Sequence, residues 1–242
     1  KTIAGSGTTA ITALHSTLGA NLANVDSTTT TAAFDGSGTF TGTLDGAVVT
    51  VADGVTMTAA ANVVAGETVN KSSSGVLAVK VGTADAAVDL TTIGGTAFST
   101  VTVFEDTTFT GTLDDALKTS VDSGQTLTTT AAIADGKTIA GSGTTAITAL
   151  HSTLGADLSN ITSTSVTAAF DSSGTFTGNL GSAAVTVASG QTLTTTAAIA
   201  DGKTIAGSGT TAITALHSTL GANLANVDST TTTAAFDGSG TF

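Results

Sequence analysis

Three histidines are the side chains of this sequence best suited to proton transfer or metal binding, and all three lie in one recurring segment. The segment TALHSTLGA carries His15, His151 and His217, and it occurs at Thr12–Ala20, Thr148–Ala156 and Thr214–Ala222. A serine follows each histidine, and nucleophilic catalysis needs a serine, a histidine and an acid within hydrogen-bond reach. Neighbouring residues of a strand point to opposite faces, however, so adjacency in sequence does not assemble such a site.

The sequence also contains a copy of this segment that lacks the histidine. Gly75–Ile93 aligns without gaps on Gly143–Ile161, and Thr83 then stands opposite His151. Because one copy does without the imidazole, we interpret the histidines as surface or corner residues. The alternative is a weak, stacked metal contact or a pH-sensitive contact. No catalytic residue is assigned, and we expect no enzymatic activity.

The leucines of the segment have near-helical spacing at Leu14, Leu18 and Leu22, but Gly19 interrupts the pattern. Threonine and asparagine, which surround it, form helices poorly. The aligned stretch of the middle copy, VLAVKV, alternates as a strand does. The segment is therefore predicted to be strand, corner, strand.

Asp-Gly pairs recur along the chain and raise the question of calcium. The pair suits tight turns that need a positive φ, which is the main interpretation. Clustered carboxylate and carbonyl oxygens also attract Ca²⁺, although the glycine-aspartate nonapeptide of calcium-binding repeats is missing. The candidate metal ligands are the aspartates of the six pairs, and no other cofactor is expected: Asp35, Asp45, Asp53, Asp135, Asp201 and Asp237.

The densest acidic cluster contains Glu105, Asp106, Asp114 and Asp115. Paired carboxylates can hydrolyse glycosidic bonds. The sequence has no Trp, Tyr or Arg, however, so the usual companions of sugar binding are absent, as is the strong cation that a polysaccharide lyase needs. We interpret the cluster as a solvated edge that discourages lateral strand pairing.

Composition and charge exclude several classes of function. Charged residues make up 10% of the chain, against roughly 25% in an ordinary globular domain. The net charge of −12 argues against binding to nucleic acid or to an anionic membrane surface. No apolar run approaches the ~18 residues of a membrane span. A cysteine-free, acidic, threonine-rich chain fits an extracellular location on a bacterial cell surface.

Internal repeats decide the domain organisation. Lys1–Phe40 is identical to Lys203–Phe242, and Ser123–Ala156 is identical to Ser189–Ala222. The unit is 66–70 residues long, and three units make a period of 202 residues. We expect one continuous array, cut from a longer one, with a partial unit at 1–65, units at 66–135 and 136–201, and a partial unit at 202–242.

Each unit divides into pieces of about 22 residues, which is the length of one coil of a parallel β-solenoid. Threonine and valine favour strands. The predicted fold is therefore all-β: a parallel, right-handed β-helix-like solenoid with about three coils per unit. A β-sandwich array is the main rival, but its domains usually have ~100 residues. Two sets of phenylalanines are predicted to fill the core: Phe34, Phe170 and Phe236, and Phe40, Phe176 and Phe242.

Two loose motifs recur with the unit: Gly-x-Thr-apolar at Gly54, Gly124 and Gly190, and Thr-Phe-Thr-Gly at Thr39, Thr108 and Thr175. With the threonine-rich composition, they resemble the tandem repeats of giant bacterial β-strand-repeat adhesins and related filament-forming surface proteins. The resemblance spans the whole chain. It implies an extracellular stalk or fibre, and it carries over no catalytic residues.

The expected function is accordingly structural: a repeat module of a fibre that serves adhesion, cell-to-cell contact or surface coating. The expected partners are further copies of the fibre, with cell-surface glycans or another cell beyond them. The alternative function is a repeated calcium- or glycan-binding module along one face.

Overall fold

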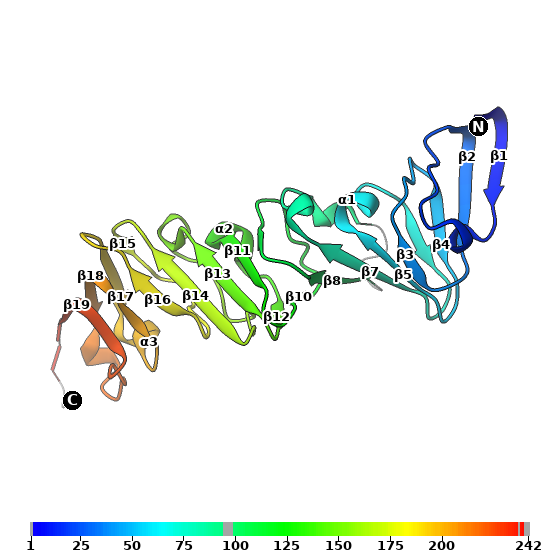
Figure 1. The fold of residues 1–242 in the computed structure, drawn as a ribbon. Coiled ribbons are helices and arrows are strands. Elements are labelled where there is room, and N and C mark those ends of the chain that lie inside the picture. The colour runs from blue at the N-terminus through cyan, green and yellow to red at the C-terminus, as the bar shows by residue number, and fades with distance from the viewer. Residues whose placement is uncertain (1, 94–98, 237, 240–242) are drawn as a thin grey trace. The chain divides into compact units, whose positions relative to one another are not determined.

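The computed structural model describes residues 2–93, 99–236 and 238–239 (Figure 1). It consists mostly of parallel β-sheet, so the all-β class is confirmed. The chain divides into two compact units, residues 1–122 and 123–242. Over the described ranges, no helix has both the length and the apolar character needed to span a bilayer.

Unit 1 contains ten strands and four short helical turns within the described residues. The strands are β1 (Ile3–Ile11), β2 (Val25–Phe34), β3 (Gly38–Phe40), β4 (Val48–Val51), β5 (Thr56–Ala60), β6 (Val69–Lys71), β7 (Val76–Val81), β8 (Ser99–Val103), β9 (Thr107–Thr108) and β10 (Thr119–Val121). The turns are α1 (Ala61–Val64) and the 3₁₀ segments η1 (Leu14–Thr17), η2 (Thr83–Asp85) and η3 (Leu90–Thr92).

Unit 2 repeats these elements with small differences in length. Its strands are β11 (Thr126–Thr130), β12 (Ile139–Gly141), β13 (Thr144–Thr148), β14 (Ser165–Phe170), β15 (Gly174–Thr175), β16 (Ala184–Val187), β17 (Thr192–Thr196), β18 (Ile205–Thr214) and β19 (Val227–Ala234). Its helical turns are α2 (Ala131–Ala134), α3 (Ala197–Ala200), η5 (Leu150–Ser152) and η6 (Leu216–Ser218).

Each strand pairs in parallel with a strand roughly one predicted coil further along the chain. In unit 1 one sheet has the order β1-β2-β4-β6, and another runs through β3, β5, β7, β8 and β10. In unit 2 the sheet runs through β11, β13, β14, β16, β18 and β19, and β15 and β17 join it at β18. Thr31 pairs with Val48 and Ile3 with Val25, which are separations of 17 and 22 residues.

Identical segments form identical pairs. Ile3 lies opposite Val25 in β1 and β2, and Ile205 lies opposite Val227 in β18 and β19. Both pairs shift register at the same place, between the first glycine and the threonine three residues later. The sequence of a segment therefore sets its pairing in both units.

Alternation along the strands places the core on one face of each sheet. In β7, the side chains of Leu77, Val79 and Val81 are buried and those between them are half-buried. In β13, Thr145 is fully buried beside Ile147, and its hydroxyl is hydrogen-bonded to that of Ser163 at 2.7 Å. A threonine can therefore replace an aliphatic residue inside, because a neighbouring hydroxyl satisfies it.

The predicted phenylalanine core is confirmed at four positions and wrong at one. Phe34, Phe40, Phe170 and Phe176 have no exposed surface. Phe236 is 40% exposed, because it lies two residues beyond β19, which pairs only with β18 among the described strands. Its equivalent Phe34 ends β2 and is covered by β4, where it pairs with Val51. The sixth predicted position, Phe242, lies outside the described residues.

The corner predicted at the histidines is a single 3₁₀ turn between extended segments, not an α-helix. In η1, η5 and η6 the residue before the turn is an alanine with φ near +50°, namely Ala13, Ala149 and Ala215. This left-handed alanine reverses the chain direction, and the leucine after it points inward, with Leu14 2% and Leu150 0% exposed. The prediction of strand, corner, strand is therefore confirmed.

Candidate functional site

The histidine corners bring together a histidine and an aspartate that lie 20 residues apart in sequence. His15 Nδ1 is 2.5 Å from Asp35 Oδ1, and His151 Nδ1 is hydrogen-bonded to Asp171 Oδ1. The His15 and Asp35 side chains are 38% and 45% exposed, so the pair lies on the surface, as predicted. Asp237, the residue equivalent to Asp35 in the third copy, lies outside the described residues.

The serines of these corners do not complete a catalytic triad. Ser16 Oγ donates a hydrogen bond to the carbonyl of Ala13 at 2.7 Å, and Ser152 Oγ donates to that of Ala149 at the same distance. These serine hydroxyls therefore bind the backbone that precedes the turn. The histidine–aspartate pair joins two neighbouring strand-to-turn corners, which is a structural role.

The copy that lacks the histidine makes the same corner-to-corner contact with other residues. Thr83 donates its amide and its hydroxyl to Glu105 Oε1, at 2.6 and 3.0 Å. A threonine–glutamate contact thus replaces the histidine–aspartate pair. This substitution explains why the imidazole is dispensable at this corner.

The aspartates of the Asp-Gly pairs mostly hold the backbone of a neighbouring segment. Asp135 accepts the amide of Asp157, and Asp201 accepts that of Asn223, both at 2.7 Å. The glycines of four pairs have the positive φ that was predicted, at Gly46, Gly54, Gly136 and Gly202. The prediction is wrong for Gly36, which lacks a positive φ; a side chain there would collide with the imidazole of His15.

Asp53 shows the electrostatic consequence of this arrangement. Its Oδ1 accepts hydrogen bonds from the hydroxyl of Ser74 and from the Ser74 amide, the latter at 2.8 Å. These bonds, the hydroxyl first, lower the pKa of Asp53 below its ordinary value. Asp157 has a lowered pKa for the same reason, with Ser159 as the donor.

Calcium binding at these turns stays a prediction. Asp35 and Asp45 belong to different turns, and Asp45 itself has a positive φ of 50°. Within the residues that the structure describes, no group of three or more histidine, aspartate or glutamate side chains is placed to hold an ion. Melting with and without EGTA tests the prediction directly.

The acidic cluster does not form a pair of opposed carboxylates. Asp114 Oδ1 accepts the amides of Ala116 and Leu117, at 2.7 and 3.1 Å, and so shapes its own turn. Glu105 is bound to Thr83.

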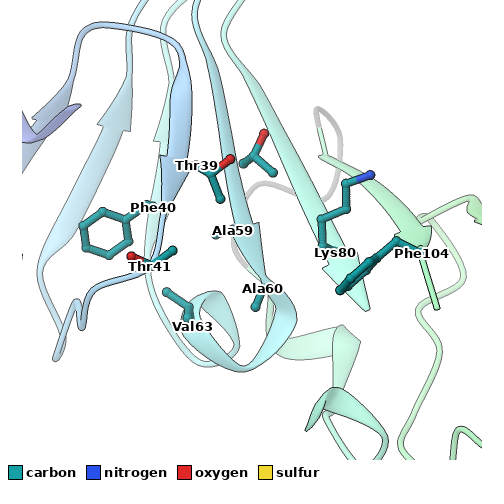
Figure 2. A pocket seen from close by; sticks show the side chains of 9 residues that line it. Thr39, Phe40, Thr41, Ala59, Ala60, Val63, Lys80 and Phe104 are labelled. Carbon is teal, nitrogen blue, oxygen red and sulfur yellow. The ribbon is translucent and has the colours of Figure 1, made fainter. Parts of the chain in front are cut away.

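A groove in unit 1, with a volume of about 510 Å³, is a feature that the sequence did not predict (Figure 2). It lies over β3, β5 and β7, beside helix α1. Its walls are apolar, and its only charged lining residue is Lys80. The apolar walls are Phe40, Ala59, Ala60, Val63 and Phe104, and the hydroxyls come from Thr39, Thr41 and Thr58.

Phe104 reaches the surface because of a one-residue shift of register. Val103 pairs with Val121, whereas Phe170 pairs with Val187, the residue equivalent to Val121 in the next repeat. Val103 therefore occupies the core position that Phe170 fills in unit 2. Phe104, one residue later, points to the opposite face and is 45% exposed.

A second substitution opens the wall of the groove at helix α1. Thr130 caps α2 through a hydrogen bond to its side chain from the amide of Ile133 at 3.4 Å, but the equivalent Ala60 has no hydroxyl. Asp85 compensates from the neighbouring corner. It is 3% exposed and accepts the amides of Asn62 and Gly82, at 2.8 and 3.0 Å.

Comparison with family models, with curated proteins and with solved structures found no match to this chain. The argument about function therefore rests on the chain's own geometry and on the internal comparison between its repeats.

Proposed function

We propose that the chain is a structural repeat module of a long extracellular fibre, folded as a parallel β-solenoid of right-handed, β-helix-like coils. The fibre serves attachment to a surface, contact between cells or coating of the cell. Each coil contributes one layer, and the number of repeats sets the reach. No catalytic residue is part of this proposal.

One observation carries the proposal: strands pair in parallel with the strand about one coil later, and the identical segments repeat their register. The partners Ile3 and Val25, and again Ile205 and Val227, are 22 residues apart. A coil whose two edges both form parallel pairs can be followed by another such coil. Arrays of this kind have no inherent limit of length, because each repeat contacts only its neighbours.

Burial supports the same view. Ile205 in β18 has no exposed surface, because β18 pairs with β16 on one side and β19 on the other. Ile3, the same residue of the identical segment, is 49% exposed in β1, which pairs with β2. A coil is thus fully buried only when coils lie on both sides of it, which favours long arrays.

The acidic surface fits an extracellular bacterial fibre with further copies of itself, cell-surface glycans or another cell as partners. A net charge of −12 keeps neighbouring fibres apart except where specific contacts form.

Small-angle scattering on chains that differ by one period tests the proposal. A period of 202 residues corresponds to about nine coils of about 22 residues, and each coil adds ~4.8 Å. The maximum dimension should therefore grow by about 40 Å for each added period. A control chain of the same added length in scrambled order should not show this growth.

Electron microscopy of the native material gives the second readout. Long fibres are expected. Globular particles, or a maximum dimension that grows as the cube root of chain length, would contradict the proposal.

A further inference from the structure

We propose that the groove over β3, β5 and β7 is a binding site for a small amphipathic carboxylate, with an apolar body and one negative charge. The site is a property of the middle repeat and is independent of the fibre role. The proposal rests on three substitutions that meet in this groove, on an uncompensated cation, and on a volume suited to a small molecule.

The three substitutions are chemically different and converge in space. Ala60 stands where the other repeats have Thr130 and Thr196. Lys80 stands opposite Thr148 in the ungapped alignment. Phe104 takes the outward position after the strand, which Asp171 takes after Phe170. Each change exchanges a small polar or acidic side chain for an apolar or cationic one.

The strand pairing explains why these residues share one surface. Lys80 pairs with Ala60 on β5 and with Thr102 on β8. Phe104 lies two residues after Thr102, and so on the same face and diagonal to Lys80. Figure 2 shows Lys80 and Phe104 side by side, with Ala60 and Val63 across the groove.

Lys80 differs from the threonine that it replaces in its bonding. Thr148 Oγ1 donates to the carbonyl of Thr129 at 3.2 Å, and Thr214 donates to that of Thr195 at the same distance. Lys80 makes no salt bridge or hydrogen bond through its amine within the described part of the chain. Its half-buried stem lines the groove, which leaves the ammonium group for a ligand.

The acidic side chains on the adjoining corners already have other partners. Glu105 accepts two hydrogen bonds from Thr83, and Asp85 accepts the amides of Asn62 and Gly82. The positive charge of Lys80 is therefore available in a chain that is otherwise strongly acidic. Charge complementarity selects an anion.

The size and the walls of the groove select the rest of the ligand. About 510 Å³ lies within the ~300–1,000 Å³ of small-molecule sites. Phe104 and Phe40 offer aromatic surface, and Ala59, Ala60 and Val63 offer aliphatic surface. An aryl- or alkyl-carboxylate places its body against these walls and its charge at Lys80. A sugar would find few polar groups here besides threonine hydroxyls.

The experiment uses 4-phenylbutyrate as the probe and 4-phenylbutanol as its neutral counterpart. Binding is followed by ¹H–¹⁵N NMR titration of the full 242-residue chain. We expect shifts at the amides of Ala60, Lys80 and Phe104, and tighter binding of the carboxylate than of the alcohol. Lys80→Thr should weaken carboxylate binding about ten-fold, as expected for loss of a charged hydrogen bond, and leave the alcohol unchanged.

Two further variants keep the test decisive. Phe104→Asp installs the residue of the other repeats and should abolish binding of both probes. Lys137→Thr removes the same charge from unit 2 and should change neither affinity. Failure of both probes to bind at millimolar concentration, or equal affinity for carboxylate and alcohol, would overturn the proposal.

Self-association is the competing outcome. If sedimentation shows a concentration-dependent dimer that Phe104→Asp abolishes, the groove belongs to an interface between copies and the small-molecule proposal is wrong. The fibre proposal would survive any of these outcomes, because its test measures dimension against repeat number.

Discussion

Phe104 and Phe170 end the same strand of successive repeats, and the structure predicts very different costs for their removal. Phe170 has no exposed surface and pairs with Val187 in the interior. Replacement of such a phenylalanine by alanine costs about 3–5 kcal/mol of unfolding free energy, since it removes buried surface and leaves a cavity. We therefore expect Phe170→Ala to destabilise unit 2 by that amount.

Phe104 should cost far less. Full burial of a phenylalanine contributes about 1.5–3 kcal/mol, and Phe104 keeps 45% of its surface exposed. Phe104→Ala should therefore lower the unfolding free energy of unit 1 by about 1 kcal/mol. Phe34→Ala provides the matched control within unit 1, because Phe34 is fully buried and should behave as Phe170 does.

The assay must resolve the two units, because a repeat array need not unfold in a single step. Native-state hydrogen exchange, read by mass spectrometry on peptides from β8 and β14, gives the opening free energy of each unit separately. Near-equal costs for Phe104→Ala and Phe34→Ala would refute the register shift that places Phe104 outside. A negligible cost for Phe170→Ala would refute the assignment of the core.

Three further predictions follow from the polar contacts. Asp85→Asn should cost about 1–3 kcal/mol of unit 1 stability in urea, because an amide cannot accept both backbone bonds; no change would contradict the capping role. The lowered pKa of Asp53 contributes stability that is present above the ordinary pKa of about 3.9 and is lost as the pH falls through the lowered value. The destabilisation by Asp53→Asn should thus fade in acid, and Ser74→Ala should raise the Asp53 pKa measured by NMR; a pH-independent difference would refute this. His151→Ala should cost under ~1 kcal/mol in the urea midpoint, because the pair is largely exposed; a much larger loss would show a role beyond the surface contact.

Much of the fold was predictable from the repeats. The identity of Lys1–Phe40 with Lys203–Phe242 required the same local structure twice, and the pairs β1–β2 and β18–β19 meet that requirement. Spacing of about one coil predicted which strands pair, and alternation in VLAVKV predicted which side chains point inward. The missing histidine at Thr83 correctly predicted that the imidazole has no catalytic role at the corner.

The groove could not be predicted in the same way, although a signal existed. Ala60 and Lys80 differ from their aligned threonines, and that mismatch marks the middle repeat. Sequence alone does not say that these two positions and Phe104 share a face, because they lie on different strands up to 44 residues apart. Only the pairing of β5, β7 and β8 brings them together.

What the sequence alone determined is therefore the period, the strand-rich class and the inward positions of each strand, because these depend on local spacing that every repeat shares. What only the tertiary structure decided is the register between strands: that Phe104 faces out while Phe170 faces in, and that Asp85 caps α1 where Ala60 cannot. The physical reason is that side chains alternate with a period of two. A shift of one residue in a turn some 20 residues away reverses the face without altering the local sequence pattern.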